Sequence, residues 1–297
     1  MTTLHRPAPS LAIGADPVAL TAADADWVYC GLRVVALGAG ETRAFTTGEN
    51  EMAALPLGGS LTIEVDGERF ELVGRDDVFA AVTDWAYLPI DAEVRLSTTS
   101  GCEVALPSAR ATRRFDPAHI AAAAVPIEVR GAGPATRQVN GFCAPDAFDG
   151  ADRLMCVELL TPDGNWSSYP PHKHDGTEGC VVSNEEIYYF RVGQTGVPGY
   201  SRDGFALHRT YTTDGDLDEN VVVRDGDVFL IPRGYHGPCI AAPGYPLYYL
   251  NVLAGPGAER SMAFCDDPAH HWVRESWANT PVDPRCPMTS ASALETR

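Results

Sequence analysis

The sequence predicts an all-β protein in which two jelly-roll barrels follow one another in a single chain. Its 28 glycines and 23 prolines are spread along all 297 residues and separate short runs rich in Val, Ile, Leu, Tyr and Phe. Runs of this kind, bounded by turn residues, are typical of strands, and no helical stripe of comparable strength accompanies them. Residues 75–79 (Arg-Asp-Asp-Val-Phe) return as residues 224–229 (Arg-Asp-Gly-Asp-Val-Phe), which indicates duplication of one all-β unit.

The composition supports two buried cores and narrows the class of partner. Apolar residues make up 45% of the chain, which is enough for each barrel to bury a core. The 22 basic and 40 acidic residues give a formal net charge of −18. Because nucleic acids and anionic membranes attract positive surfaces, we expect neither as a partner and favour a small molecule.

Two further sequence features bear on the compartment. The first residues contain no apolar leader, and no later apolar run is long enough to span a bilayer, so we expect a cytoplasmic protein. The eight cysteines include no Cys-x-x-Cys pair and are expected to be free thiols, several of them buried.

The first barrel is expected within residues 1–120. Gly58-Gly59 and Asp66-Gly67 are taken as turns between its strands. Residues 115–125 are taken as a connector with one short helical turn, and they give the boundary between the two domains. The expected strands are residues 27–36, 51–56, 60–65, 70–73, 78–82 and 93–98.

The second barrel is expected within residues 121–297. Its strands begin near Ile127 and are interrupted by Gly, Pro and Asp at short intervals. The stretch beyond Pro268 has no strand pattern, and we expect it to lie across a barrel or a partner subunit. The expected strands are residues 137–142, 154–160, 186–192, 205–211, 220–223, 228–231 and 247–253.

Three histidines and a glutamate in the second barrel predict a metal site. Pro170 and Pro171 favour an extended segment, on which His172 and His174 point to the same face because strand side chains alternate. An isolated His-x-His is more often a surface or core feature. The prediction therefore depends on the two residues that follow in order, Glu186 before an apolar run and His236 after a Pro-Arg-Gly turn.

Three neutral imidazoles and one carboxylate suit a borderline divalent ion. We expect one divalent transition metal, with zinc as the first candidate and manganese or iron as alternatives, and with one or two positions open for substrate or water. The first barrel has no histidine between His5 and His119, so it cannot hold the same site.

These residues resemble the two cupin motifs, Gly-x5-His-x-His-x(3,4)-Glu-x6-Gly and Gly-x5-Pro-x-Gly-x2-His. Trp166 occupies the leading glycine position, the gap between His174 and Glu186 is longer than usual, and the second motif is one residue short before its histidine. Glu186 is preferred to Glu185 because it has the x6 spacing to a glycine. The resemblance implies two cupin barrels of the double-stranded β-helix type, the first of them degenerate.

Longer phrases resemble the 5-deoxy-glucuronate isomerase family of myo-inositol catabolism over nearly all of the second half and, more loosely, the first. The resemblance implies an aldose–ketose isomerase that converts 5-deoxy-D-glucuronate, a small sugar acid, to 5-dehydro-2-deoxy-D-gluconate through a metal-stabilised enediolate. Cupins often pair through sheet edges, so a homo-oligomer is expected. His208 and the Gly-Pro-Cys that follows His236 depart from the family pattern. The matching phrases are residues 165–175, 185–191, 204–207, 223–228, 232–236 and 248–256.

The implied reaction moves a proton between C2 and C1, so it needs an acid/base group as well as the metal. A tyrosine, a metal-bound hydroxide or His208 could serve. Tyr188 shares a strand face with Glu186 and should point toward the metal, although core packing explains it equally well. Tyr249 and Asn251 share a face of the last strand and could line the mouth of the barrel.

The carboxylate of a sugar acid calls for a cation, for which arginine offers a bidentate fork. Arg209 is the first candidate. Together with Tyr211 it falls on the same strand face as the apolar residues Phe205 and Leu207, and we expect this face to line the barrel interior. Lys173 lies between the two ligand histidines and should project away from them.

Two other kinds of function stay open. One is another metal-dependent cupin enzyme, such as a 4-deoxy-hexuronate isomerase or an iron dioxygenase, which metal identity and an oxygen requirement would distinguish. The other is a non-catalytic sugar-binding cupin. The absence of a DNA-binding helix pattern and the acidic charge argue against a regulatory protein of that kind.

Overall fold

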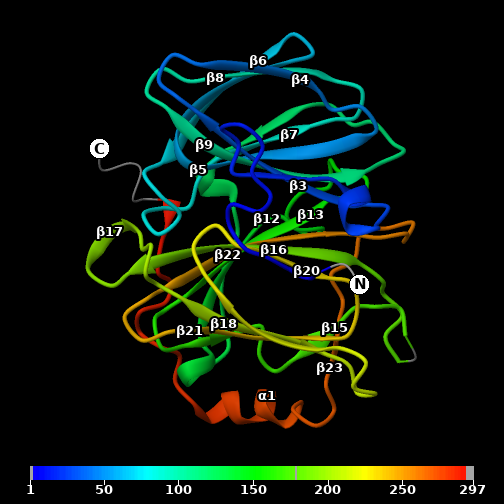
Figure 1. Cartoon of the computed structure of the whole chain (residues 1–297), viewed down its shortest axis with the longest axis vertical. Helices are drawn as coiled ribbons and strands as arrows, with labels where there is room; N and C mark the ends of the chain where they lie inside the picture. Colours follow the sequence, from blue (N-terminus) through cyan, green and yellow to red (C-terminus); the bar gives the residue numbers. More distant parts are fainter. Residues whose placement is uncertain (1–2, 178, 292–297) are drawn as a thin grey trace.

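Strands form one sheet in an N-terminal lobe and two sheets in a C-terminal lobe in the part of the chain that the structure describes (Figure 1). The structure is a computed structural model and describes residues 3–177 and 179–291. The all-β prediction is confirmed. No helix among these residues has the length and apolar character needed to cross a membrane. All eight cysteines are free, as expected.

The N-terminal lobe is a single sheet that curls around its own core. Its core is made by side chains such as Val35, Ile63 and Leu96, all fully buried. The strands are β2 (Val18–Leu20), β3 (Cys30–Leu37), β4 (Thr42–Thr46), β5 (Asn50–Val65), β6 (Glu68–Arg75), β7 (Trp85–Leu88), β8 (Glu93–Ser97), β9 (Cys102–Arg110) and β10 (Ala118–Ile120).

The sheet curls because β5 runs for 16 residues and changes partners midway. Its register with β9 shifts between Pro56 and Gly58. Gly59 has φ +87°, and a Cβ there would lie 2.3 Å from the carbonyl oxygen of Gly101. The expected turn at Gly58-Gly59 is therefore wrong, because the two glycines form a bulge that bends one continuous strand. Residues 78–82, expected as a strand, form a buried turn instead.

The C-terminal lobe is a sandwich of an eight-stranded and a six-stranded sheet. The first contains β1 (His5–Arg6), β11 (Ile127–Arg130), β12 (Arg137–Cys143), β13 (Met155–Thr161), β16 (Glu185–Gln194), β17 (Val197–Tyr200), β20 (Val228–Ile231) and β22 (Leu247–Ala254). The second contains β14 (Trp166–Ser167), β15 (His172–Lys173), β18 (Ala206–Tyr211), β19 (Asp218–Val223), β21 (Tyr235–Ala241) and β23 (Cys265–Asp266).

The helices are short and lie outside the sheets. Among them, η2 supplies the helical turn expected in the connector, between the last strand of the N-terminal sheet and the first of the C-terminal lobe. They are η1 (Ala22–Ala25), η2 (Ala122–Ala124), η3 (Gly133–Ala135), α1 (Trp272–Ser276) and η4 (Trp277–Asn279).

The two lobes share a buried core, because the eight-stranded sheet presents one face to each side. On β16, Ile187 and Tyr189 pack toward the N-terminal lobe, whereas Tyr188 and Phe190 pack inside the C-terminal sandwich. Glu185 belongs to the first face, where its carboxylate accepts hydrogen bonds from the backbone N–H groups of residues 28–30, each 2.8 Å long. The alternation of this strand therefore joins the lobes on one face and leaves the other for a site.

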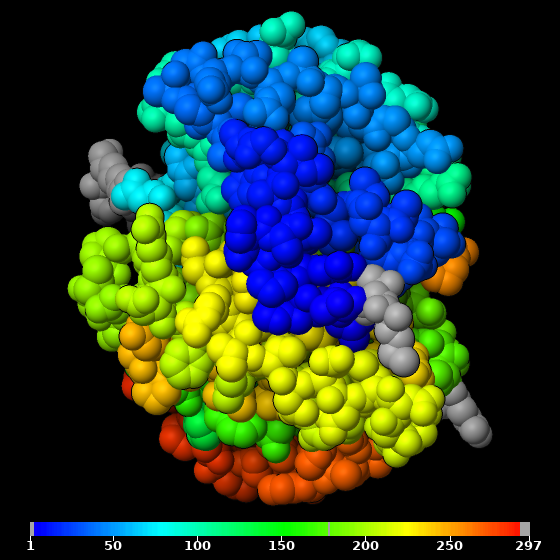
Figure 2. Space-filling model, in the orientation of Figure 1, coloured from blue at the N-terminus to red at the C-terminus, as the bar shows by residue number. Residues whose placement is uncertain are grey.

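Each end of the chain crosses to the other lobe. Strand β1 pairs with β20, so the dark-blue N-terminal segment runs over the yellow surface of the C-terminal lobe in Figure 2. The C-terminal stretch runs along the C-terminal lobe, where Gly133 N–H donates to Pro281 O over 2.8 Å. It then reaches the N-terminal lobe, where Val82 N–H donates to Ser290 O. The expectation that this stretch lies across a barrel is confirmed.

Candidate metal centre

Three strands bring the candidate ligands together inside the C-terminal sandwich. Strands β15 and β21 pair in the six-stranded sheet with His172 opposite His236, and His174 directly follows β15. Glu186 faces them from β16 of the other sheet. His174 Nε2 lies 2.8 Å and His236 Nε2 3.1 Å from the same oxygen, Glu186 Oε2. One ligand atom from each of these three residues lies within 4.8 Å of the other two.

Buried polar atoms at this point lack partners, which is the signature of a site that fits a cation. Glu186 Oε1 and His236 Nδ1 make no hydrogen bond although both are buried. Leaving such atoms unsatisfied is costly unless another group binds them. Imidazole nitrogens and a carboxylate oxygen are the ligands that a borderline divalent ion prefers, so the residues present fit such an ion.

The electrostatics of the cluster favour a neutral His172, a neutral His236 and an ionised Glu186. Burial lowers the pKa of His236 well below its usual value. Burial and the neighbouring His174 lower the pKa of His172 to about 3. Burial alone would raise the pKa of Glu186, but His236 and His174 bring it below its usual value. These are the protonation states in which these three side chains present a lone pair to a metal.

His172 lies beside the three-residue group. Its ring centroid is 4.5 Å from that of His236 and 4.8 Å from that of Phe264. Its Nδ1 is 3.3 Å from the carbonyl oxygen of Pro170. The structure thus brings three of the four expected ligands to one point, with the fourth at the wall of the adjacent pocket.

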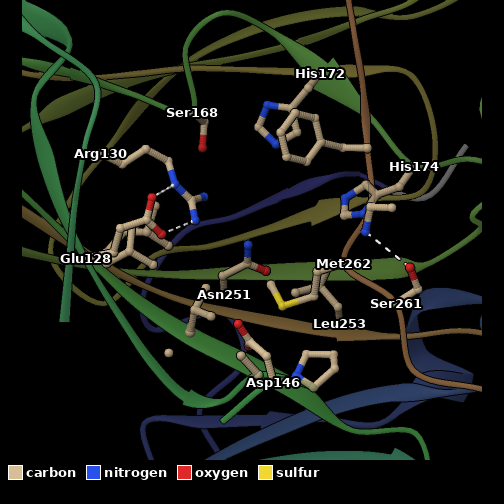
Figure 3. Close-up of a pocket in the computed structure, with 18 of the residues that line it drawn as sticks. Glu128, Arg130, Asp146, Ser168, His172, His174, Asn251, Leu253, Ser261 and Met262 are labelled. Atoms are coloured by element: carbon tan, nitrogen blue, oxygen red, sulfur yellow. Dashed lines mark hydrogen bonds and ion pairs between the residues drawn. The ribbon is translucent and has the colours of Figure 1, made fainter. Parts of the chain in front are cut away.

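A pocket of about 450 Å³ opens onto this group. Figure 3 shows His172 and His174 on one side and Glu128 with Arg130 on the opposite side, with Ser168 between them. His172, His174 and Glu186 all contribute to the wall. The cluster therefore lies at one end of a cavity that a small molecule can enter.

Two other candidates face this pocket. Tyr188 and Asn251 both line it, and Tyr189 and Arg191 turn to the other lobe, as strand alternation predicts. The Tyr188 hydroxyl lies 3.1 Å from Ser168 Oγ. Ser168 Oγ in turn lies 2.8 Å from the hydroxyl of Tyr249, which is buried behind the pocket wall. A chain of three hydroxyl groups therefore runs from the pocket into the core.

The interior position expected for Arg209 and Tyr211 is wrong. Arg209 lies on the outer face of β18, where its side chain is 40% exposed and donates to Asp218. Tyr211 lies beneath it and donates to Asp267. The expected two-residue alternation along β18 is correct, but the face expected to line the interior is the outer face. Leu207, which shares this face with Arg209, is 42% exposed.

The other two candidates, His208 and Lys173, lie outside the pocket wall. His208 faces the interior, where its Nε2 lies 2.9 Å from Thr210 Oγ1, and burial lowers its pKa to about 3. Its ring centroid lies 4.4 Å from that of Phe229 and 5.6 Å from that of Tyr188, which separates it from the pocket. Lys173 projects outward, as expected, and its Nζ lies 3.5 Å from Asp175.

Several residues of the pocket and its surroundings were not predicted from the sequence. Ser168 stands in a left-handed conformation (φ 47°) just before the two prolines. Asn184 reaches His174 Nδ1 with its amide nitrogen at 3.3 Å. Arg137 enters the cavity from β12, on the face of Val139. Of these, only Arg137 could have been identified from the sequence, because it is a cationic residue at the first position of an expected strand.

Comparison with known proteins places these features in a family. Residues 11–273 match the model of the KduI/IolB family. The chain is 40% identical over 262 residues, 87% of this chain and 91% of the relative, to a 5-deoxy-glucuronate isomerase of Geobacillus kaustophilus (strain HTA426). It is 35% identical over 259 residues, 86% of this chain and 92% of the relative, to the 5-deoxy-glucuronate isomerase of Bacillus subtilis (strain 168).

Solved structures resemble the fold. An IolB-like protein from Salmonella typhimurium LT2 superposes with a TM-score of 0.83 and 31% identity, covering 92% of this chain and 99% of that one. The oxalate decarboxylase of Bacillus subtilis superposes with a TM-score of 0.57 and 13% identity, covering 84% and 74%. The second likeness concerns the fold alone.

Proposed function

The chain belongs to the KduI/IolB family, and we propose that it is an aldose–ketose isomerase that converts 5-deoxy-D-glucuronate to 5-dehydro-2-deoxy-D-gluconate. The observation that carries this proposal is the buried group of His174, Glu186 and His236 at one end of an open pocket. An isomerase of this kind must stabilise negative charge on two adjacent oxygens, and unpaired ligand atoms beside a cavity suit that task.

We propose that His172, His174, Glu186 and His236 together hold one divalent transition metal, with zinc as the first candidate. Three neutral imidazoles and one carboxylate match the preference of zinc, and they also suit manganese or iron. When bound, the metal would act as a Lewis acid toward the C1 and C2 oxygens of the sugar. His172 completes the set because it lines the pocket next to His236.

The chain's own groups orient the substrate and hold protons around these oxygens. The Tyr188 hydroxyl reaches the pocket and lies within hydrogen-bond distance of Ser168, so it can donate to a sugar oxygen while Ser168 keeps the hydroxyl oriented. Asn251 also lines the pocket, and its buried Oδ1 lacks a partner, so it can accept a bond from a substrate hydroxyl. We assign proton donation to Tyr188 in preference to His208, which does not line the pocket.

The test is to follow the aldehyde proton of 5-deoxy-D-glucuronate by NMR with metal-loaded and chelator-treated protein. We expect turnover only with metal, and recovery when a divalent ion is added back. Full activity in protein shown by elemental analysis to be metal-free would contradict the proposed role of the metal. No reaction in a metal-loaded sample would contradict the proposed substrate.

We also propose a homo-oligomer. On the outer face of the six-stranded sheet, Trp166, Leu207 and Val222 are 37%, 42% and 46% exposed. Leu207 pairs in register with Val222 and with Ile240, and Ile240 pairs with Trp166, so these side chains form one apolar patch. Light scattering on the purified chain tests this, because a monomeric mass would contradict it.

A further inference from the structure

We propose that Arg137 binds the carboxylate of the substrate, on the β11–β12 side of the pocket that holds the metal centre. This inference rests on the proposed function, because it assigns the far end of the same sugar acid. Arg137 is the first residue of β12 and pairs in register with Arg130 of β11. Its side chain enters the C-terminal sandwich, lines the pocket and is only 3% exposed.

Arg137 forms no ion pair with a carboxylate among the described residues, and the nearby Glu128 is already paired with Arg130. Its Nη1 donates to the carbonyl oxygens of Ala135 (3.1 Å) and Tyr169 (3.4 Å), and neither of these carries a charge. Its Nε is buried without any partner. Burial also lowers the pKa of this guanidinium to about 10. A buried cation with unpaired donors destabilises the fold unless an anion binds it.

The other arginines of the pocket are already satisfied. Arg130 donates to both carboxylate oxygens of Glu128. Arg274 forms the same two-pronged pair with Asp266. Arg260 donates to the backbone carbonyl oxygens of residues 143, 148 and 154. Of these four cations, Arg137 alone retains a buried donor without a partner.

The position of Arg137 suits the shape of the proposed substrate. In a linear six-carbon sugar acid, the aldehyde and the carboxylate are at opposite ends of the chain. Figure 3 shows Arg130, the register neighbour of Arg137, across the pocket from His172 and His174. If the aldehyde end of the sugar lies at the histidines, its carboxylate therefore lies toward β11 and β12. Ser168 and Asn251 line the pocket between these two ends.

The surroundings of Arg137 strengthen an ion pair there. Its guanidinium carbon lies 5.7 Å from the ring centroid of Trp277, which belongs to η4 of the C-terminal stretch. The ring covers the cation and restricts water on that side. An anion bound in such a site is attracted more strongly than in bulk water, because the local dielectric constant is low.

The test compares the acid with its uncharged counterpart, 5-deoxy-D-glucose, in binding to metal-free protein. Calorimetry should show that the wild type prefers the acid, and that Arg137→Met loses this preference by on the order of 10- to 100-fold. Arg137→Lys keeps the charge without the fork and should lose several-fold less. Arg209→Met is the matched control, since Arg209 is paired with Asp218 outside the pocket, and it should leave the preference unchanged.

Kinetics with metal-loaded protein give a second readout that a merely structural role would not produce. Arg137→Met should raise the KM for 5-deoxy-D-glucuronate by a similar factor with a smaller change in kcat. If Arg137→Met does not fold, Arg137→Lys decides, because equal effects on acid and neutral sugar would overturn the inference. A wild type without preference for the acid would also overturn it. A wild type that prefers the acid yet does not isomerise it would contradict the proposed function instead.

Discussion

Replacing Arg75 by methionine should lower the free energy of unfolding by about 3–5 kcal/mol, because it leaves Glu158 as an unpaired buried carboxylate. Arg75 ends β6 of the N-terminal lobe, and Glu158 lies on β13 of the C-terminal lobe. Their side chains are 0% and 1% exposed and form an ion pair across the shared core. After the substitution, Glu158 would retain the Tyr248 hydroxyl at 2.9 Å and the Asn140 amide at 3.1 Å.

A second variant separates the charge effect from lost packing. In Arg75→Met/Glu158→Gln both charges are gone, and the amide can still bond to Tyr248. We expect it to recover about 2 kcal/mol of the loss, because a buried ion pair and a neutral replacement of similar size have similar stability. The carbonyl oxygens of Pro56 and Ala81 lose their Arg75 donor in both variants, so this cost cancels in the comparison.

Urea unfolding followed by tryptophan fluorescence measures these values. Trp85 is a good reporter of both lobes, because it is fully buried in the N-terminal lobe and packs 5.3 Å from Phe142 of the C-terminal lobe. A loss below about 1 kcal/mol in Arg75→Met, or a double variant no more stable than the single one, would refute the reasoning. Metal content should be unchanged in either variant, since Glu158 does not line the pocket.

Two other predictions concern carboxylates with distinct roles. Glu186→Gln should weaken metal binding by on the order of 100-fold or more, which elemental analysis would show as lost metal. Glu185→Gln should keep the metal and lower the free energy of unfolding by about 1–3 kcal/mol, because Glu185 lies at the lobe interface. The reverse pattern would contradict the ligand assignment. Partial burial raises the pKa of Asp152, but hydrogen bonds from Thr112 and Arg113 bring it from 3.8 to about 2. The stabilising contribution of Asp152 is thus complete above pH 3.8 and lost as the pH falls toward 2. The melting temperatures of wild type and Asp152→Asn should therefore differ most near neutral pH and converge near pH 2. A difference that does not change with pH would rule this out.

The parts of the fold that the sequence predicted are those in which local pattern and tertiary packing agree. Strands β16 and β22 are long and apolar on both faces, and their limits agree with the expected ranges to within two residues. On β16 the x6 spacing to Gly193 favours Glu186, and the two-residue alternation then puts Glu185 on the opposite face and Tyr188 on the face of Glu186. These properties follow from strand geometry, which a sequence shows directly.

The errors arise where a local pattern has two physical readings. Leu207 of β18 and Phe205 just before it lie outside, and the inner positions of the strand are held by Ala206, His208 and Thr210. Alternation gives the period of a strand but not which face is buried. The sequence puts Arg137 at the start of an expected strand but does not show the role proposed for it, because that role depends on an unpaired donor in a pocket formed by segments distant in sequence.

The exchange of chain ends between the lobes has a consequence for synthesis on the ribosome. His5 finds its partner at Phe229, so the first strand to be made has no place to pair until most of the chain has emerged. The turn at Val82 must also wait, because its N–H donates to the carbonyl oxygen of Ser290, close to the end of the chain. We therefore expect the nascent N-terminal lobe to fold with a loose leading segment, which only the finished chain fastens in place.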